Sequence, residues 1–243
     1  MTPLPEAVAL SDGERHLTCA EMQTGVDELA ERLQAQGTRV LATLMDNSMG
    51  WVVADRAAEQ AGVAHVPLPV FFTPQQIAHA LRVAGVDSLL TVPALAQHWP
   101  QAEAHDWDVV GTPLRCLRLP AAGLSMPAGT AKLTFTSGTT GTPKGVCLSG
   151  AAMQTVAGGL AQALAPLDIR RHLCALPLPV LLENIAGLMA PLSQGAACTV
   201  LPLEQVGLTG SSKFDPARLH AAVLAHRPNS LILLPQMLRA WTA

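Results

Sequence analysis

Charge is scarce in this sequence and nearly balanced in sign. Charged residues make up 14% of the 243 residues, and the formal net charge at pH 7 is −3. Proteins that bind nucleic acid neutralise its phosphates with clustered Lys and Arg side chains. The sequence contains no such basic cluster, so we do not expect nucleic acid as a partner.

The cysteines and histidines form no local metal-binding or redox pattern. The five cysteines are Cys19, Cys116, Cys147, Cys174 and Cys198, and no two of them have C-x-x-C spacing. The eight histidines include no H-E-x-x-H pattern. Zinc sites and redox pairs usually show such spacings. The sequence therefore predicts free thiols in a reducing compartment and no metal ligands.

No segment has the pattern of a leader peptide or a membrane span. Residues 1–6 lack the basic residues and the long apolar run of a secretory signal. The most apolar region, 173–203, is interrupted by four prolines and by Glu183. We therefore expect a cytoplasmic protein without a transmembrane segment, in which this region forms a buried strand–helix–strand unit.

A stretch rich in hydroxyl groups and glycine lies near the middle of the chain. It reads Thr136-Ser137-Gly138-Thr139-Thr140-Gly141-Thr142-Pro143-Lys144-Gly145. The hydroxyls can donate to phosphate oxygens, the glycines let backbone N–H groups approach a ligand, and Lys144 adds a positive charge. Short apolar runs on both sides, 133–135 and 145–149, are typical of strands. The pattern predicts a hairpin whose loop binds the phosphates of a nucleotide.

The same stretch does not fit the phosphate loop of kinases and GTPases. That loop requires Gly directly before its Lys and Ser or Thr directly after it. Pro143 and Gly145 occupy those two positions here. A mononucleotide kinase or GTPase is therefore not indicated.

The stretch resembles the phosphate-binding signature of the adenylate-forming superfamily, which includes acyl-CoA synthetases, nonribosomal peptide adenylation domains and luciferases. The resemblance implies that residues 136–145 hold the β- and γ-phosphates of ATP, bound with Mg²⁺, while a substrate carboxylate attacks the α-phosphate. It also implies that Lys144 and Thr139 act in catalysis by stabilising charge on the departing pyrophosphate.

Other segments extend this resemblance from about Leu17 to the end of the chain. Residues 17–22, Leu-Thr-Cys-Ala-Glu-Met, are similar to the family's "LTYAEL" segment. Asn47-Ser48 matches its "NS" turn, and residues 62–68 resemble its "GA-x-x-VPL" strand. The resemblance therefore covers nearly the whole chain.

Alternating apolar runs and amphipathic segments predict an α/β fold with parallel sheets flanked by helices. Expected strands are 40–44, 62–68, 172–176, 197–201 and 230–234, and expected helices are 23–36, 51–61, 183–193 and 215–225. Asp215-Pro216 marks the start of the last helix. We expect one incomplete AMP-binding N-terminal domain over 1–243, with subdomains 1–97 and 130–243 joined by 98–129.

The segment 176–183, Leu-Pro-Leu-Pro-Val-Leu-Leu-Glu, resembles the "LPLAH-x-x-E" segment of long-chain fatty acyl-CoA synthetases. The resemblance implies that Val180 and Glu183 contact a fatty acyl substrate. Val180 replaces the histidine of most relatives, which favours a wider or drier alkyl tunnel. An acid in the first turn of a helix is also stabilised by the helix dipole, so a purely structural role for Glu183 stays open.

The family's Gly-x-Thr-Glu segment, its ribose-binding Asp and its C-terminal Lys have no counterparts in this sequence. We therefore expect the N-terminal part of a ligase that forms an acyl-adenylate and passes the acyl group to coenzyme A, whose site this chain does not encode. Two alternatives stay open. One is a short, non-catalytic nucleotide- or partner-binding module of the same fold, and the other is an enzyme that adenylates aryl or amino acids or loads an acyl carrier protein.

Overall fold

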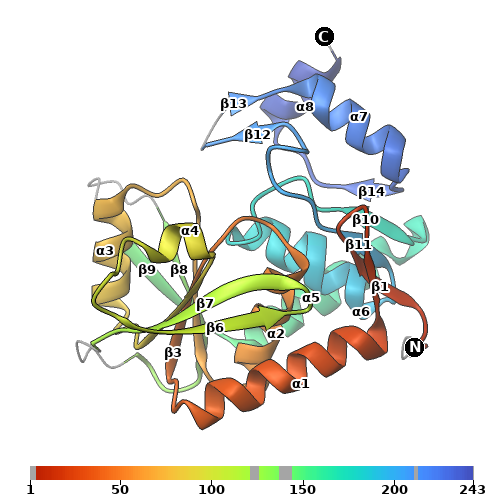
Figure 1. Ribbon diagram of the computed structural model, residues 1–243. Helices are drawn as coiled ribbons and strands as arrows, with labels where there is room; N and C mark the ends of the chain where they lie inside the picture. The colour runs from red at the N-terminus through yellow and green to blue at the C-terminus, as the bar shows by residue number, and fades with distance from the viewer. Residues whose placement is uncertain (1–3, 121–125, 137–143, 211–212, 243) are drawn as a thin grey trace. The chain divides into compact units, whose positions relative to one another are not determined.

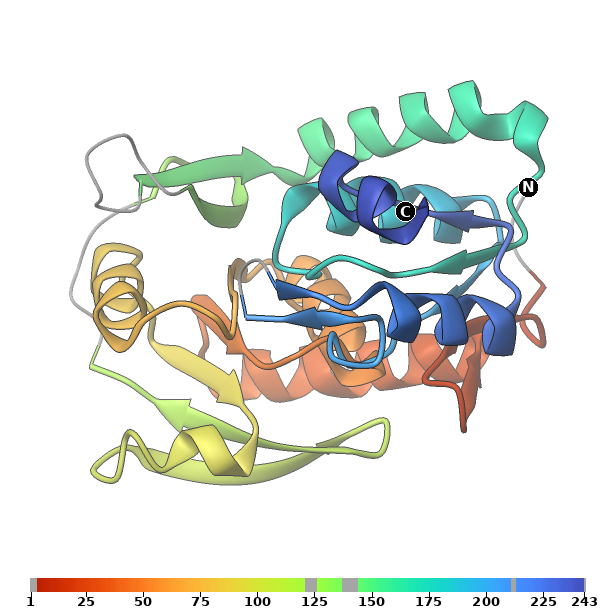
Figure 2. The ribbon, with the colours of Figure 1, turned by 90° about the horizontal axis from the view of Figure 1, so that it is seen from above.

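The computed structural model describes residues 4–120, 126–136, 144–210 and 213–242. They fall into two compact units, which the chain enters more than once (Figures 1 and 2). The first unit takes residues 1–22, 46–49 and 153–243, and the second takes 23–45 and 50–152. This division differs from the expected halves 1–97 and 130–243, because the expected joint at 98–129 contributes two strands to the sheet of the second unit.

The second unit is built on a seven-stranded sheet in the order β6-β7-β5-β3-β4-β8-β9. The strands are β3 (Val40–Leu44), β4 (Ala64–Leu68), β5 (Ser88–Thr91), β6 (Glu103–Val109), β7 (Thr112–Arg118), β8 (Thr130–Thr136) and β9 (Lys144–Ser149). The four strands β5, β3, β4 and β8 run parallel, whereas β7, β6 and β9 are antiparallel to their neighbours. The predicted parallel strands at 40–44 and 62–68 are confirmed.

Helices α1 (Cys19–Ala35), α2 (Met49–Ala61), α3 (Pro74–Val83) and α4 (Pro93–Ala96) accompany this sheet. Helix α3 begins as its sequence indicates, because the Thr73 hydroxyl accepts a hydrogen bond from the Gln76 N–H and the Gln76 side chain accepts one from the Thr73 N–H. Apolar side chains of α3 and of the parallel strands form one buried core. Helices α1 and α2 lie side by side, where Gln60 Nε2 donates to Asp27 Oδ1 over 2.8 Å (Figures 1 and 2).

A buried polar network lies where β8 joins the parallel strands. His65 on β4 and Lys132 on β8 are partners in the strand register. Both side chains bind the carboxylate of Asp55 on α2, with Lys132 Nζ at 2.7 Å and His65 Nδ1 at 2.6 Å from Oδ1. Thr43 Oγ1 on β3 lies 2.9 Å from His65 Nε2. Three elements of the second unit thus meet at one carboxylate, and β3 joins them through the contact between Thr43 and His65.

In this network, neighbouring charges and burial shift the pKa values of Asp55 and His65 in opposite directions. Burial alone would raise the pKa of Asp55, but the charge of Lys132 and the hydrogen bond with His65 hold that pKa well below its usual range. Burial lowers the pKa of His65, although the Asp55 carboxylate acts in the other direction. The folded state therefore holds an ionised carboxylate against an ammonium group, in a region that excludes water.

The first unit contains a five-stranded sheet in the order β14-β10-β11-β1-β2 and a separate β12–β13 pair. Its strands are β1 (Val8–Ser11), β2 (His16–Thr18), β10 (Arg171–Leu173), β11 (Ala197–Thr199), β12 (Leu208–Thr209), β13 (Lys213–Phe214) and β14 (Ser230–Leu231). The strands β14, β10, β11 and β1 are parallel, as predicted for this part of the chain. The strands predicted at 172–176, 197–201 and 230–234 end earlier in the structure, at Leu173, Thr199 and Leu231.

Helical segments of this unit are α5 (Gly150–Leu164), η1 (Ala165–Leu167), η2 (Leu182–Met189), α6 (Ala190–Ser193), α7 (Pro216–His226) and α8 (Pro235–Thr242). Asp215 caps α7 by accepting from the N–H groups of Ala217 and Arg218, which confirms the predicted start. The single helix expected at 183–193 is instead a π-helix, η2, followed by α6. The Ala190 N–H donates to the Ile185 carbonyl five residues earlier, and this wider turn replaces the α-helical pattern.

Region 173–203 forms β10, η2, α6 and β11, which confirms the expected strand–helix–strand unit. None of the helices in the described part of the chain has both the length and the apolar character that crossing a bilayer would require.

We expect Asp55→Asn to destabilise the protein at neutral pH by about 3–5 kcal/mol, because Lys132 then stays buried without its counter-charge. The pKa of Asp55 is lower in the folded state than its unfolded value of 3.8. The stabilisation is therefore complete above that unfolded pKa and is lost as the pH falls below it. Urea unfolding at neutral pH and at about pH 3 should show a smaller difference from wild type at the acid pH.

Asp106→Asn is the matched control, because Asp106 pairs with Arg115 across the exposed hairpin β6–β7, with Nε 2.6 Å from Oδ1. Exposed ion pairs contribute little to stability, so we expect almost no change in the free energy of unfolding. Equal losses in the two variants would contradict the role assigned to the buried network.

Candidate functional site

The predicted phosphate loop begins and ends on the hairpin of β8 and β9. Thr136, the last residue of β8, is in register with Lys144, the first residue of β9. The predicted strands on both sides of the loop are therefore confirmed. Seven of the predicted phosphate-binding residues lie outside the described residues: Ser137, Gly138, Thr139, Thr140, Gly141, Thr142 and Pro143.

The described residues next to this loop are compatible with ligand access. Lys144 and Gly145 are both exposed. Gly145 lies opposite Phe135 in the register, and a Cβ at Gly145 would lie only 3.1 Å from the Leu133 side chain. This close approach favours glycine at the start of β9.

The direction of β8 places its last residue at a particular edge of the sheet. Because β8 runs parallel to β4 and β3, Thr136 lies at the edge where the carboxyl ends of these strands meet. Ligands of open α/β sheets bind outside the carboxyl ends of the strands. The predicted loop therefore starts at the edge where this class of sheet binds its ligands.

The predicted acyl segment, 176–183, follows β10 in the first unit and leads into η2. The side-chain amide of Asn47, which is 2% exposed, holds its start. Asn47 Nδ2 donates to the Leu176 carbonyl over 2.9 Å, and Asn47 Oδ1 accepts from the Leu178 N–H over 2.9 Å. One buried amide thus satisfies backbone groups on both sides of Pro177, which has no N–H to donate.

The two predicted substrate residues of this segment differ in exposure. The Val180 side chain is at the surface, with 39% of the residue exposed, and Leu182 is exposed as well. Glu183 is 0% exposed. Its Oε1 lies 3.0 Å from His172 Nε2, and its Oε2 accepts from the Leu176 N–H over 3.2 Å. Both carboxylate oxygens of Glu183 are therefore bonded to protein groups, while Val180 remains accessible.

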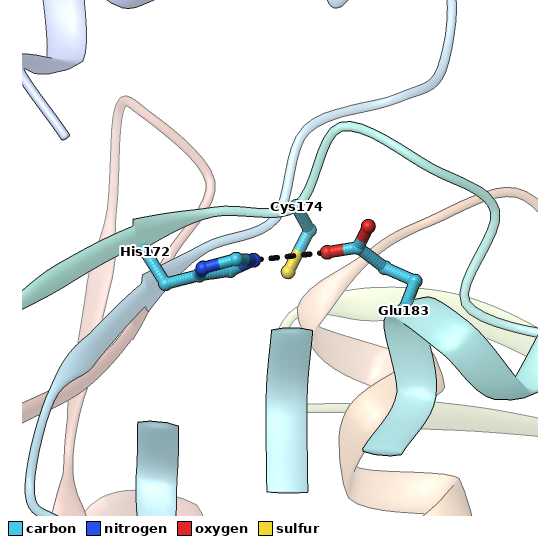
Figure 3. Close-up of side chains that lie close together, drawn as sticks. All are labelled: His172, Cys174 and Glu183. Carbon is cyan, nitrogen blue, oxygen red and sulfur yellow. Dashed lines mark hydrogen bonds and ion pairs between the residues drawn. The ribbon is translucent and has the colours of Figure 1, made fainter. Parts of the chain in front are cut away.

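His172, Cys174 and Glu183 form a buried cluster in the first unit (Figure 3). One donor atom from each residue lies within 4.8 Å of the donor atoms of the other two. Figure 3 shows the imidazole and the carboxylate pointing toward one another, with the thiol of Cys174 beside the bond between them. On the other side of the ring, His172 Nδ1 lies 3.0 Å from Ser230 Oγ on β14.

Burial has the largest effect on the pKa values of the Glu183 carboxyl and the Cys174 thiol. It raises the pKa of the Glu183 carboxyl, although the hydrogen bond with His172 acts in the other direction. It also raises the pKa of the Cys174 thiol well above its usual value, and the nearby Glu183 carboxylate adds to the rise. Burial and the neighbouring carboxylate therefore both oppose ionisation of the Cys174 thiol.

The spacing of this cluster in the sequence matches no common metal-binding or catalytic motif. His172 lies on β10 and Cys174 directly follows that strand, where its N–H still bonds to the Thr199 carbonyl. In such an extended segment, residues two apart have their side chains on the same face. Glu183 comes from the π-helix after the next turn. Strand alternation could have paired the first two residues, but their approach to Glu183 depends on the path of the chain between them.

Comparison with known proteins places the chain in a family. The family model of AMP-binding enzymes matches residues 2–243. Tyrocidine synthase 3 of Brevibacillus parabrevis is 30% identical over an alignment 152 residues long, which covers 60% of this chain and 2% of that protein. Feruloyl-CoA synthase of an Amycolatopsis species is 28% identical over an alignment 257 residues long, gaps included, which covers 98% of this chain and 48% of that protein.

Solved structures show the same architecture. o-Succinylbenzoate CoA synthetase from Bacillus subtilis, in complex with an acyl-adenylate intermediate, aligns with a TM-score of 0.72 at 23% identity, over 98% of this chain and 61% of that chain. A malonyl-CoA ligase with methylmalonyl-CoA and AMP bound aligns with a TM-score of 0.72 at 28% identity, over 96% and 46% of the two chains.

The parallel sheets flanked by helices are thus those of the N-terminal domain of adenylate-forming enzymes, and the predicted fold class is confirmed. The chain belongs to the family of AMP-binding enzymes, as its resemblance implied. It spans about half the length of the feruloyl-CoA synthase and a small fraction of the tyrocidine synthase.

We expect Gly187→Ala to destabilise the protein by about 1–3 kcal/mol, the usual cost of overpacking a core. A Cβ at Gly187 would overlap Glu183 Oε1 and lie 2.8 Å from His172 Nε2. Gly158→Ala is the control, because a Cβ at this helical position meets no atom within 4 Å. It should stabilise α5 by about 0.5–1 kcal/mol. Urea unfolding of both variants tests this, and a neutral Gly187→Ala variant would show that the cluster is loosely packed.

Proposed function

We propose that this chain supplies the ATP-phosphate site of an AMP-forming ligase that activates a carboxylic acid and transfers it to a thiol. The observation that supports this most is the position of the stretch 136–145. Its sequence has the hydroxyls, glycines and lysine that bind phosphate, and its flanking strands end at the ligand-binding edge of a parallel sheet. Family membership supports the same conclusion.

The proposed reaction has two steps. A carboxylate oxygen of the acid attacks the α-phosphorus of MgATP, the bond from that phosphorus to the bridging oxygen breaks, and pyrophosphate leaves. A thiolate then attacks the carbonyl carbon of the acyl-adenylate and AMP leaves. The protein contributes mainly by positioning the reactants and by stabilising the charge that develops on the phosphates.

Particular residues take roles in the first step. The Lys144 ammonium and the Thr139 hydroxyl stabilise the charge on the departing pyrophosphate. The hydroxyls of Thr136, Ser137 and Thr140 donate to phosphate oxygens, and the glycines present backbone N–H groups. Mg²⁺ arrives as part of the substrate, MgATP.

For the acid we propose a fatty acyl substrate. Val180 and Leu182 present apolar surface at the start of η2, in the segment that resembles the long-chain synthetases. An aryl or amino acid is the second candidate, because one relative of this chain is a feruloyl-CoA synthase and the superfamily includes nonribosomal peptide adenylation domains. The acceptor is coenzyme A or an acyl carrier protein, and its site lies outside this chain.

We expect Lys144→Ala to slow ATP–pyrophosphate exchange by about 10²–10³-fold, the usual loss when one group that stabilises a developing charge is removed. The assay requires the whole polypeptide that contains this chain, with fatty, aryl and amino acids tested separately. The double variant Thr139→Ala/Thr140→Ala should slow exchange as well. The identity of the acid that supports exchange distinguishes the two substrate candidates.

Lys213→Ala is the control for the loss of one lysine, because Lys213 is exposed and lies in the first unit on β13. It should exchange at the wild-type rate. Unchanged exchange in Lys144→Ala would remove the loop from the mechanism. Saturable ATP binding without exchange for any acid would instead favour the non-catalytic nucleotide-binding module.

A further inference from the structure

The buried cluster of His172, Cys174 and Glu183 combines three kinds of donor atom. An imidazole nitrogen, a thiol sulfur and a carboxylate oxygen lie within 4.8 Å of one another, and all three residues are buried. This is the donor set that proteins use for zinc. In a tetrahedral zinc site, bond lengths of about 2.0–2.3 Å place the donor atoms about 3.3–3.8 Å apart. Shifts of about 1 Å or less would bring the three side chains to those separations.

Neighbouring groups fix the direction of two of the donors. Ser230 Oγ lies 3.0 Å from His172 Nδ1, so that Nε2 points into the cluster. The Leu176 N–H binds Glu183 Oε2 over 3.2 Å, which directs Oε1 to the same place. Zinc ligands in proteins are generally oriented by such hydrogen bonds on their far side. The cluster therefore has the supporting contacts of a ligand set as well as the ligands.

A fourth donor is close to the cluster. Cys198 on β11 is in register with His172 on β10, and residues in register on neighbouring strands place their side chains on the same face of a sheet. In the structure the Cys198 thiol donates weakly to the Gly187 carbonyl over 3.7 Å. If it turned from this carbonyl toward the cluster, Cys198 would give a donor set of one nitrogen, one oxygen and two sulfurs.

The π-helix leaves space for the cluster. Any side chain at Gly187 would overlap Glu183 Oε1 and approach His172 Nε2. π-Helical turns are rare and occur frequently at functional sites. The glycine in this turn therefore allows the Glu183 carboxylate and the His172 ring to pack against the backbone of η2.

From these observations we propose that His172, Cys174 and Glu183, with Cys198 as the fourth donor, bind one Zn²⁺ ion. Thiolate donors favour zinc over magnesium or calcium. Binding displaces the thiol protons and any carboxyl proton, and the resulting anions supply the negative charge that a buried dication requires. The ion replaces the hydrogen bond between His172 and Glu183.

The proposed ion would have a structural role. Its ligands His172 and Cys174 precede the segment 176–182, and Glu183 follows it. A metal bound to both ends would close this segment into a short loop, to which Asn47 adds its two hydrogen bonds. The inference concerns only the first unit and does not depend on the proposed ligase activity.

The test measures the metal content of the protein purified from zinc-supplemented cells and dialysed, by mass spectrometry of the elements. We expect about one zinc per chain. We also expect Co²⁺ substitution to produce the absorption band of a cobalt–thiolate bond. Cys174→Ser should lose both signals, and Ser230→Ala should weaken zinc affinity by about 10–100-fold, because Ser230 acts through His172.

Cys116→Ser is the matched control, because Cys116 is also a buried thiol but lies on β7 in the second unit. It should keep the zinc and the cobalt band. Wild-type protein without stoichiometric metal and without a cobalt–thiolate band would overturn the proposal and leave a metal-free, hydrogen-bonded cluster. If Cys174→Ser does not fold, the metal content and cobalt spectrum of the wild type decide alone.

Discussion

The attachment of the phosphate hairpin to its sheet depends on the buried carboxylate of Asp55. Strand β8 carries the start of the proposed phosphate loop, and its register with β4 is set at His65 and Lys132. Both of these side chains bind Asp55, which lies on α2. A change at Asp55 would therefore affect the position of β8 as well as the stability of the second unit, because helix and strands share one charge pair.

The first unit uses a carboxylate in a different way. Glu183 is buried like Asp55, but among the described residues its charged partner is only His172, and burial raises its pKa. Asp55 binds both His65 and Lys132, and the charge of Lys132 lowers its pKa. The Asp55 carboxylate lies against a lysine ammonium group, which cannot bind a metal ion while it is protonated. Glu183 instead lies beside an imidazole and a thiol, which are donor groups that bind zinc. This difference in neighbours is the reason why we propose a metal site at Glu183 and not at Asp55.

Local signals were sufficient to predict several elements of both units. The apolar run at 40–44 predicted β3, the apolar runs beside the hydroxyl-rich stretch predicted β8 and β9, and Asp215-Pro216 predicted the start of α7. The strand β6 was not predicted, because its residues are mostly polar and exposed. Its place in the sheet comes from pairing with β7. Similarly, the shift from α- to π-helical hydrogen bonds in η2 has no signature in apolar periodicity.

The side-chain partners were less predictable than the elements. Lys132 and Asp55 are 77 residues apart in the sequence, and Asn47 binds residues 129 and 131 positions further along the chain. No local pattern encodes such pairs, since they depend on the path of the chain through the fold. The proposed phosphate loop, in contrast, could be recognised from the sequence, because its hydroxyl, glycine and lysine residues follow one another in 136–145.

The most direct test of the account compares the binding of three ligands to the purified chain by equilibrium dialysis. ATP carries both adenosine and phosphates, pyrophosphate carries only phosphates, and adenosine carries none. The comparison therefore separates binding through the phosphates from binding through the adenosine part. The account predicts saturable binding of ATP and of pyrophosphate, both weakened by Lys144→Ala, and little binding of adenosine. The reason is that the proposed phosphate loop lies in this chain, whereas the sequence contains no counterparts of the family's adenine- and ribose-binding segments. Folded protein that binds neither ATP nor pyrophosphate would contradict the account.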